Sequence, residues 1–302
     1  MKLGSLSISG RLWLAPMVRV TDPAFRVLCR EQGAALAFTE MISAEALARK
    51  ISKIVEETKA HKSDRPLGVQ IAANNPKTAA LAVQNADPSA DLFDLNLGCP
   101  VRKATSQGVG SALLSDPVKI GEIISAMRKA TDKPITAKMR VPYKVETAVE
   151  IAKILEKNGC DAITIHARTP KQFHTGIINF DAVRLIRESI GIPVINNGGV
   201  RDKESLELIF EKTGCEAVML ARSAIGNPGI FAELSGKKGI SKIDGLKRYL
   251  VLCQELGFTH SGRIKQQAIR FASANKSADL VKKLEKVRSI EDCTNSINTL
   301  FP

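Results

Sequence analysis

One cysteine lies where a thiol could take part in a reaction. Cys99 follows the apolar run Leu92–Leu97 and precedes Pro100, which ends a strand because proline cannot donate to the ladder. Residues 101–109, which come next, are rich in basic and polar side chains and cannot be core. A lone cysteine is often only a buried structural residue. A thiol at the base of a polar loop is nevertheless well placed to give a proton to a substrate, so Cys99 is the candidate catalytic residue.

The elements that would position this thiol alternate strictly between strand and helix. Short apolar or β-branched runs recur at residues 12–15, 36–38, 67–71, 92–95, 135–138, 162–166, 193–196 and 217–220. Helical segments follow them at residues 23–32, 44–53, 76–85, 117–130, 145–158, 180–189, 203–213 and 227–234. Parallel strands need helical crossovers, and eight such units close into a barrel. The predicted fold class is therefore α/β, a (β/α)8 TIM barrel.

Three helix starts support this alternation. Asp22, Asn75 and Asp116 each precede a proline, so a capping side chain stands before a first helical residue of fixed φ. We therefore expect helices to begin at residues 23, 76 and 117.

The residues just past the strands form the candidate site, because catalytic groups of such barrels lie at the carboxyl ends of the strands. Lys138 could stabilise the negative charge of a reduced flavin ring, and Gln70 could bond the ring's amide edge. A lysine at a strand end usually reaches to solvent. Here alternate residues from Thr136 to Arg140 are polar, which directs them to one side of the strand. His166 could be a core histidine, but with Arg168 two residues on we favour a site role.

Two neighbouring loops carry signals for a phosphate group. Asn197, Gly198 and Gly199 follow the seventh strand, and Ala221 and Arg222 follow the eighth. The glycines could be turn residues only. Bare backbone N–H groups in adjacent loops, beside an arginine, are however the usual phosphate site of such barrels, and we predict one here.

Composition excludes several classes of protein. The chain has 302 residues, 44% of them apolar, and no stretch approaches the length of a membrane helix. Its N-terminus lacks the apolar core of a signal peptide, so we expect a cytoplasmic protein without membrane association. The six cysteines never approach a CxxC spacing, which predicts free thiols and no metal site.

The C-terminal segment is unusually basic. The net charge is +13, and residues 236–302 carry 13 Lys and Arg against 6 Asp and Glu. This excess suits a polyanion such as nucleic acid, although it could be a solvated helical surface. Two sets of polar residues lie three or four positions apart and should face outward from helices: Arg263, Gln266, Gln267 and Arg270, then Lys282, Lys283 and Lys286.

Together these motifs resemble the tRNA-dihydrouridine synthase family across residues 12–231. The matching segments are Leu-Ala-Pro-Met (14–17), Phe-Thr-Glu-Met (38–41), Asp-Leu-Asn-Leu-Gly-Cys-Pro (94–100), Gly-Ser-Ala-Leu-Leu (110–114), Lys-Met-Arg (138–140), Ile-His-Ala-Arg-Thr (165–169), Asn-Gly-Gly (197–199) and Ala-Arg-Ser-Ala-Ile-Gly-Asn-Pro (221–228). Several motifs in this order are a specific signal, whereas any one alone would be weak.

The resemblance implies an FMN-binding barrel at residues 1–235, a helical tRNA-binding domain at residues 240–302, and reduction of a tRNA uridine to dihydrouridine with NADPH as electron donor. Cys99 becomes the proton donor. Substrate contacts fall on Asn96, Arg102, Lys103 and Arg168. The implied FMN contacts are Pro16, Met17, Val18, Gln70, Lys138, His166, Asn197, Gly198, Gly199, Ala221 and Arg222. We expect a monomer.

Two other functions remain open from the sequence. A dihydroorotate dehydrogenase-like FMN enzyme acting on a small pyrimidine would share the barrel and the cysteine loop, but would have no need of the basic C-terminal segment. A catalytically silent RNA-binding protein would explain the charge, but leaves the flavin-type residues and Cys99 without a role. A flavin in the purified protein would separate the second alternative from both enzymes.

Overall fold

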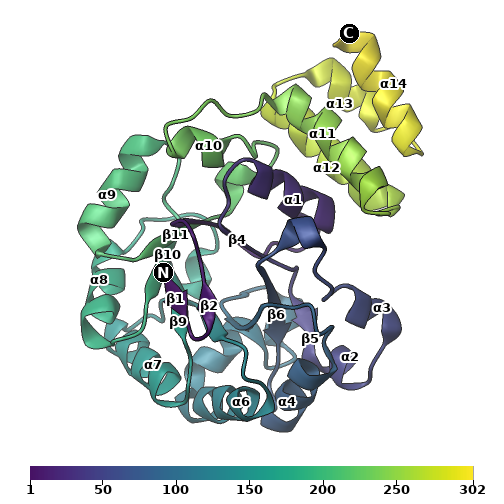
Figure 1. Cartoon of the computed structure of the whole chain (residues 1–302). Helices are drawn as coiled ribbons and strands as arrows, with labels where there is room; N and C mark the ends of the chain where they lie inside the picture. The colour runs from purple at the N-terminus through teal and green to yellow at the C-terminus, as the bar shows by residue number, and fades with distance from the viewer. Residues whose placement is uncertain (302) are drawn as a thin grey trace.

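The computed structural model, which describes residues 1–301, is a closed parallel barrel with a helical module beside it (Figure 1). The barrel strands are β3 (Leu12–Leu14), β4 (Leu36–Phe38), β6 (Leu67–Ala72), β7 (Leu92–Leu97), β8 (Ile135–Arg140), β9 (Ala162–His166), β10 (Val194–Asn197) and β11 (Ala217–Leu220). Each pairs in parallel with its neighbours, and β4 pairs with both β3 and β6, which closes the ring. The predicted (β/α)8 barrel is confirmed.

Helices surround the strands as the alternation predicts. They are α1 (Pro23–Glu31), α2 (Ala44–Ala48), α3 (Ser52–Glu56), α4 (Pro76–Asn85), α6 (Pro117–Ala130), α7 (Val145–Lys157), α8 (Phe180–Ser189), α9 (Lys203–Thr213) and α10 (Ile230–Leu234). The Asp22, Asn75 and Asp116 carboxylate or amide oxygens accept backbone N–H bonds at the starts of α1, α4 and α6, so the predicted caps are confirmed.

One predicted helix is wrong. Residues 44–53 form two short helices, because Lys50 adopts a left-handed φ of 54° that ends the first. A short strand, β5 (Ile42–Ser43), also precedes α2 and adds to β6.

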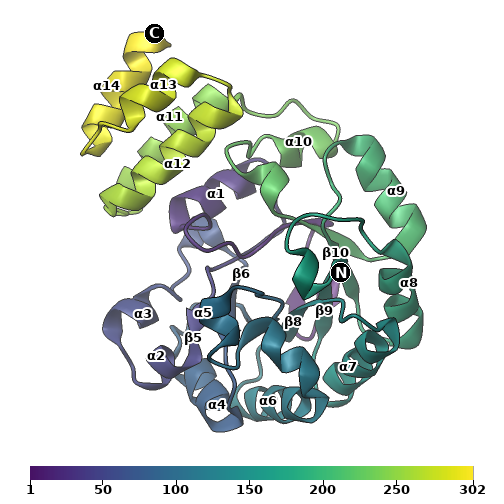
Figure 2. The ribbon, with the colours of Figure 1, turned by 180° about the vertical axis from the view of Figure 1, so that it is seen from behind.

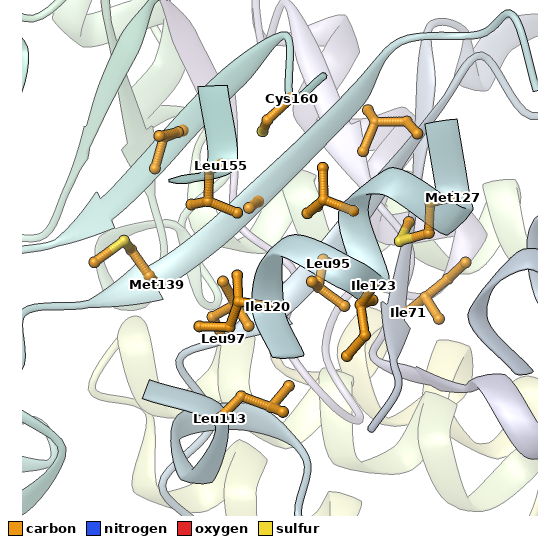
Figure 3. Close-up of a cluster of buried hydrophobic side chains, with 14 of the residues drawn as sticks. Ile71, Leu95, Leu97, Leu113, Ile120, Ile123, Met127, Met139, Leu155 and Cys160 are labelled. Atoms are coloured by element: carbon orange, nitrogen blue, oxygen red, sulfur yellow. The ribbon is translucent and has the colours of Figure 1, made fainter. Parts of the chain in front are cut away.

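Alternating side chains on the strands sort into two layers. On β7 and β8, Leu95, Leu97 and Met139 point outward and pack against α6, as Figure 3 shows with Ile120 and Ile123 of that helix. The intervening residues of both strands are polar and therefore point into the barrel. Because the odd-numbered residues of β7 and β8 pack outward against the helices, the even-numbered polar residues between them must point into the barrel.

A hairpin that the sequence reading missed lies at the amino-terminal end of the barrel. It consists of β1 (Lys2–Leu3) and β2 (Leu6–Ser7), which pair in antiparallel fashion (Figure 1). Leu3 is fully buried in one apolar cluster with Trp13 and with first residues of the strands such as Leu36 and Leu92. The hairpin therefore covers this end of the barrel.

The segment from residue 240 forms four helices: α11 (Lys242–Glu255), α12 (Ser261–Ala274), α13 (Ala278–Leu284) and α14 (Ile290–Leu300). Both views of the ribbon place α11 and α12 beside α1 (Figure 1, Figure 2). Leu246, Tyr249 and Phe271 of these helices share one apolar cluster with Phe25 of α1 and Leu14 of the barrel. The division into two domains stays a prediction, and the shared cluster indicates that they stabilise each other.

The predicted outward face of α12 is wrong in part. Arg263 forms an ion pair with Glu40 of the barrel at 2.9 Å, and Gln267 is fully buried. Gln267 and Arg270 both donate to backbone carbonyls of the loop between β3 and α1. These polar side chains face the barrel because backbone carbonyls of this loop offer them acceptors. Lys282, Lys283 and Lys286 of the second set are exposed, as expected.

Candidate functional site

A cavity of about 1030 Å³ opens at the carboxyl ends of the strands. Every predicted FMN contact lines it, from Pro16, Met17 and Val18 to Ala221 and Arg222. Cys99, Asn96 and Arg168 line it too, whereas Arg102 and Lys103 do not. The volume is at the upper end of the usual range for ligand pockets, so it suits a cofactor together with part of a substrate.

Strand register brings the site residues together in layers. Gln70 is opposite Asp94, which is opposite Thr136 on the next strand. Asn96 is likewise opposite Lys138, one layer nearer the mouth. Neighbouring residues in parallel register point to the same side of a sheet, so these side chains meet inside the barrel.

A continuous chain of hydrogen bonds connects these layers to the cysteine. Thr136 Oγ1 and Gln70 Nε2 donate to the Asp94 carboxylate at 2.6 and 2.7 Å. Asn96 Nδ2 donates to Gln70 Oε1 at 2.8 Å, and Asn96 Oδ1 accepts the Cys99 N–H at 2.9 Å. Burial raises the pKa of Asp94 to about 6, against the opposing effect of its hydrogen bonds. The buried carboxylate thus fixes both amides and, through Asn96, the backbone that carries the thiol.

Lys138 supplies a cation to the middle of the cavity. Burial lowers its pKa from 10.5 to about 8, while the Asp94 carboxylate acts in the opposite direction. A protonated amine in such a place costs desolvation energy, which a bound anion would recover. Lys138 therefore favours a ligand with negative charge.

The wider cavity wall is basic throughout. Lys138, Arg140, Arg168, Arg201 and Arg222 line it, and among the residues described no aspartate or glutamate does. Burial lowers the pKa of Arg168, and the neighbouring Arg222 lowers it further. Such mutual repulsion needs an anion to offset it.

One arginine nitrogen in this wall lacks a partner. Arg168 Nε donates to the Gly176 carbonyl at 3.1 Å, but its Nη1 is buried without a hydrogen bond among the residues described. A Cβ at Gly198 would lie 3.4 Å from that Nη1, so the free donor is beside the glycine pair. An unpaired buried donor is costly, and a phosphate oxygen would satisfy it.

The glycine pair leaves its backbone bare. Gly198 and Gly199 have φ values of 106° and 97°, a region that favours glycine. A Cβ at Gly199 would also lie 3.0 Å from Ile178 Cδ1. Asn197, just before them, is held by a 2.7 Å bond from its Nδ2 to the Met219 carbonyl. These residues fit a phosphate group approached by backbone N–H donors.

His166 is neutral in this environment. Burial lowers its pKa to about 2, and the nearby Lys138, Arg140 and Arg168 cations add to the effect. Its ring stacks on His174, with centroids 6.3 Å apart. It can therefore bond a ligand as a neutral imidazole at any physiological pH.

Cys99 differs from the other cysteines of the chain. It is half-exposed at the cavity, whereas the remaining five are buried and all six are free thiols, as predicted. Its carbonyl accepts the Ser111 N–H at 3.0 Å, and a Cβ at Gly110 would lie only 2.6 Å from that carbonyl. The loop after Cys99 therefore folds back closely, which holds the thiol at the cavity edge.

The sequence placed Arg140 on the cavity side of its strand but gave it no role in binding or catalysis. Its Nε donates to the Gly98 carbonyl at 2.9 Å, and its Nη1 to the Phe173 carbonyl at 2.6 Å. Arg140 thus ties the residue before Cys99 to the loop after β9. The alternation of polar residues along β8 predicted its direction, whereas its two acceptors come from other loops and carry no signal in the sequence.

Arg102 and Lys103 lie outside the cavity. Both are exposed on the short helix α5 (Arg102–Thr105), in the loop that follows Cys99. Their position is therefore better suited to contact the RNA backbone at the rim of the cavity than a base inside it.

Comparison with known proteins bears on this site. The sequence model of dihydrouridine synthases matches residues 13–299. The chain belongs to the dihydrouridine synthase family. A tRNA-dihydrouridine synthase B of Vibrio parahaemolyticus is 37% identical over 238 residues, which are 78% of this chain and 74% of the relative. One from Shewanella oneidensis is 32% identical over 280 residues, 90% of this chain and 87% of the relative.

A solved structure of FabK from Thermotoga maritima has a TM-score of 0.46 at 17% identity, and the match covers 73% of this chain and 63% of the FabK chain.

Family membership makes the chain a flavin-dependent oxidoreductase that reduces uridine to dihydrouridine. It favours the dihydrouridine synthase function over both the silent RNA-binding alternative and the dihydroorotate dehydrogenase-like one. In the described residues no helix is long and apolar enough to cross a membrane, and no cluster of metal-ligating side chains occurs.

Proposed function

We propose that the cavity binds FMN and a flipped-out tRNA uridine, and that NADPH supplies the electrons. The observation that carries this proposal is the composition of one cavity wall. It combines a half-exposed thiol, a half-buried lysine and a bare glycine pair beside an unpaired arginine donor, with no acidic residue among those described.

The residues present fit FMN in two parts. Gly198, Gly199, Ala221 and Arg222 would hold the phosphate, with the free Arg168 Nη1 as a further donor. Arg168 thereby acquires a second role beside the substrate contact predicted for it.

At the flavin ring of FMN, Lys138 and Gln70 would bond the polar edge, and His166 and Asn197 would line the part of the cavity that holds the ring. Gln70 donates one side-chain N–H to Asp94 and accepts a bond from Asn96 through its oxygen, so its second N–H remains free to donate. The apolar side chains of the 16–18 loop would pack against the ring.

When bound, reduced flavin would supply the hydride for C6 of the uracil ring. Cys99 would give its thiol proton to C5, which completes the addition of two hydrogens across the C5=C6 bond, and the resulting thiolate would regain a proton from solvent. Asn96, fixed by Gln70, orients the uracil near the thiol through its remaining N–H. The protein thus contributes alignment and a placed proton.

The helical module would hold the RNA while the barrel reduces the base. Lys283, Lys286 and Arg288 border a surface groove of about 400 Å³ between α13 and α14, and they outnumber Asp292, the one acidic residue among the described residues that line it, so the groove suits phosphate oxygens. Flipping a stacked uridine costs a few kcal/mol, which backbone contacts of this kind offset.

Cys99→Ala tests the central step, with Cys160→Ala as the buried control. Cys99→Ala should retain flavin and accept electrons from NADPH, while dihydrouridine formation in tRNA falls about a hundredfold or more. Cys160→Ala should leave that rate nearly unchanged once the protein is folded. Normal turnover of tRNA by Cys99→Ala would rule out the proton-donor role.

A further inference from the structure

The loop between β3 and α1 has one side toward the cavity and the other toward the helical module. Pro16, Met17 and Val18 line the cavity. The backbone just after them forms hydrogen bonds with α12. Gln267 Nε2 donates to the Val20 carbonyl at 2.8 Å, and Arg270 donates to the carbonyl of the preceding residue. This one loop is therefore a wall shared by the cavity and the module.

The residue that Arg270 reaches has a strained backbone. Arg19 adopts a φ of 62°, unusual for a residue with a side chain. Its carbonyl accepts from Arg270 Nη1 at 2.6 Å, and its N–H donates to Glu40 Oε2 at 2.7 Å. Arg263 of α12 pairs with the same Glu40 at 2.9 Å. Such a conformation persists only where its surroundings hold it, and α12 supplies part of that hold, directly through Arg270 and indirectly through the Arg263–Glu40 pair.

The two α12 side chains also hold each other. Gln267 is fully buried, and its Oε1 accepts a 2.8 Å bond from Arg270 Nη1. Both polar atoms of the Gln267 amide are thus engaged. A buried amide with this geometry fixes its acceptor closely, because any displacement of the Val20 carbonyl would leave a buried polar group unpaired.

The same turn of α12 packs on the loop after β11. A Cβ at Gly226 would lie 2.5 Å from the Arg270 carbonyl oxygen, so helix and loop are in direct contact. That loop begins with Ala221 and Arg222, which line the cavity. One helical turn therefore touches both loops at this part of the cavity wall.

We propose that Gln267 and Arg270 are positioning residues for the flavin, holding the 16–20 loop in the shape that binds it. The inference rests on the proposed function, since it assumes that this cavity holds FMN. It gives α12 a role other than RNA contact, and it makes the helical module a structural part of the flavin site.

Flavin affinity of full-length variants tests this inference. Arg270→Met keeps the apolar stem and removes the donors, and Arg270→Lys restores one donor. Arg248→Met is the matched control, because Arg248 joins the module to Glu31 of α1 at 2.5 Å without touching the loop. The apoprotein of each is titrated with FMN, and its thermal midpoint is measured alongside.

Arg270→Met should raise the Kd for FMN about tenfold, with partial recovery in Arg270→Lys, while Arg248→Met stays within about twofold of the wild type. Equal Kd values for wild type and Arg270→Met overturn the inference alone. Equal losses in Arg270→Met and Arg248→Met also overturn it, since loosened docking would then be the cause. A wild-type chain that binds no FMN overturns the proposed function and this inference with it.

Discussion

The two ends of the barrel use the same strands for opposite purposes. At the amino-terminal end, Leu3 and Trp13 are fully buried in an apolar cluster beneath the hairpin. At the carboxyl end, Lys138 and four arginines line a cavity without an acidic counterpart among the described residues. The difference shows that the residues that stabilise the barrel and the residues that line the cavity lie only a few positions apart along each strand.

Shortening a side chain at the closed end should have the largest effect. Leu3→Ala removes a fully buried side chain, and we expect a loss of about 2–5 kcal/mol in the free energy of unfolding. Urea denaturation measures that loss. The Kd for FMN of the folded protein should stay within about twofold, and a large change in it would show that the two ends are not separate.

Removing the Lys138 cation at the open end should weaken flavin binding, whereas the change at the closed end should lower the stability of the fold. Lys138→Met should weaken binding of the reduced, anionic flavin by about ten- to a hundredfold and oxidised flavin less, so the reduction potential should become more negative. Lys133→Met is the control, because Lys133 precedes the same strand and bonds the Pro88 and Ala90 carbonyls at the closed end. An unchanged flavin content and reduction rate in Lys138→Met would contradict the assignment.

The pH dependence of flavin binding sharpens the same contrast. Burial holds the pKa of Lys138 near 8, so the lysine loses its proton as the pH rises through that value. Affinity for reduced flavin should be level below about pH 7 and fall above pH 8, by up to about tenfold per pH unit. Titrations of the wild type and Lys138→Met would test this, since the variant should lack the fall.

The smallest effects should come from the exposed face of the module. Replacing Lys283 or Lys286 by Gln should weaken tRNA binding a few-fold at moderate salt and reduce the slope of log Kd against log salt concentration by about one. FMN affinity should not change. A tRNA affinity and salt slope equal to the wild type would place the RNA surface elsewhere, for example at Arg102 and Lys103.

The sequence predicted the barrel because its signals are local. Apolar runs recur with capped helices between them, and the caps at Asp22, Asn75 and Asp116 are where they were expected. The break at Lys50 was not predictable in this way, because no proline or glycine marks it. The hairpin at Leu3 also escaped, since two-residue strands carry no periodicity.

The helical module shows where such local signals end. Gln267 lies four residues after Arg263 and three before Arg270, and Lys286 lies four and three residues after Lys282 and Lys283. Both sets thus fit one face of a helix, and the sequence offers no reason to treat them differently. The first set bonds the barrel and the second set is exposed. Helical periodicity identifies a common face, but only a neighbouring surface determines whether polar residues on it meet water or buried carbonyls.

The sequence by itself determined which residues face the cavity, because every second position of a strand points to one side and the barrel gathers strand ends. It thereby identified Cys99 and Lys138. Only the tertiary structure decided which of these groups bond each other. The chain from Asp94 through Gln70 and Asn96 to Cys99 depends on the register of neighbouring strands, and the hold of Arg270 on Arg19 depends on helix docking across 251 positions of the chain. Register and docking arise from packing of the whole core, which no local segment encodes.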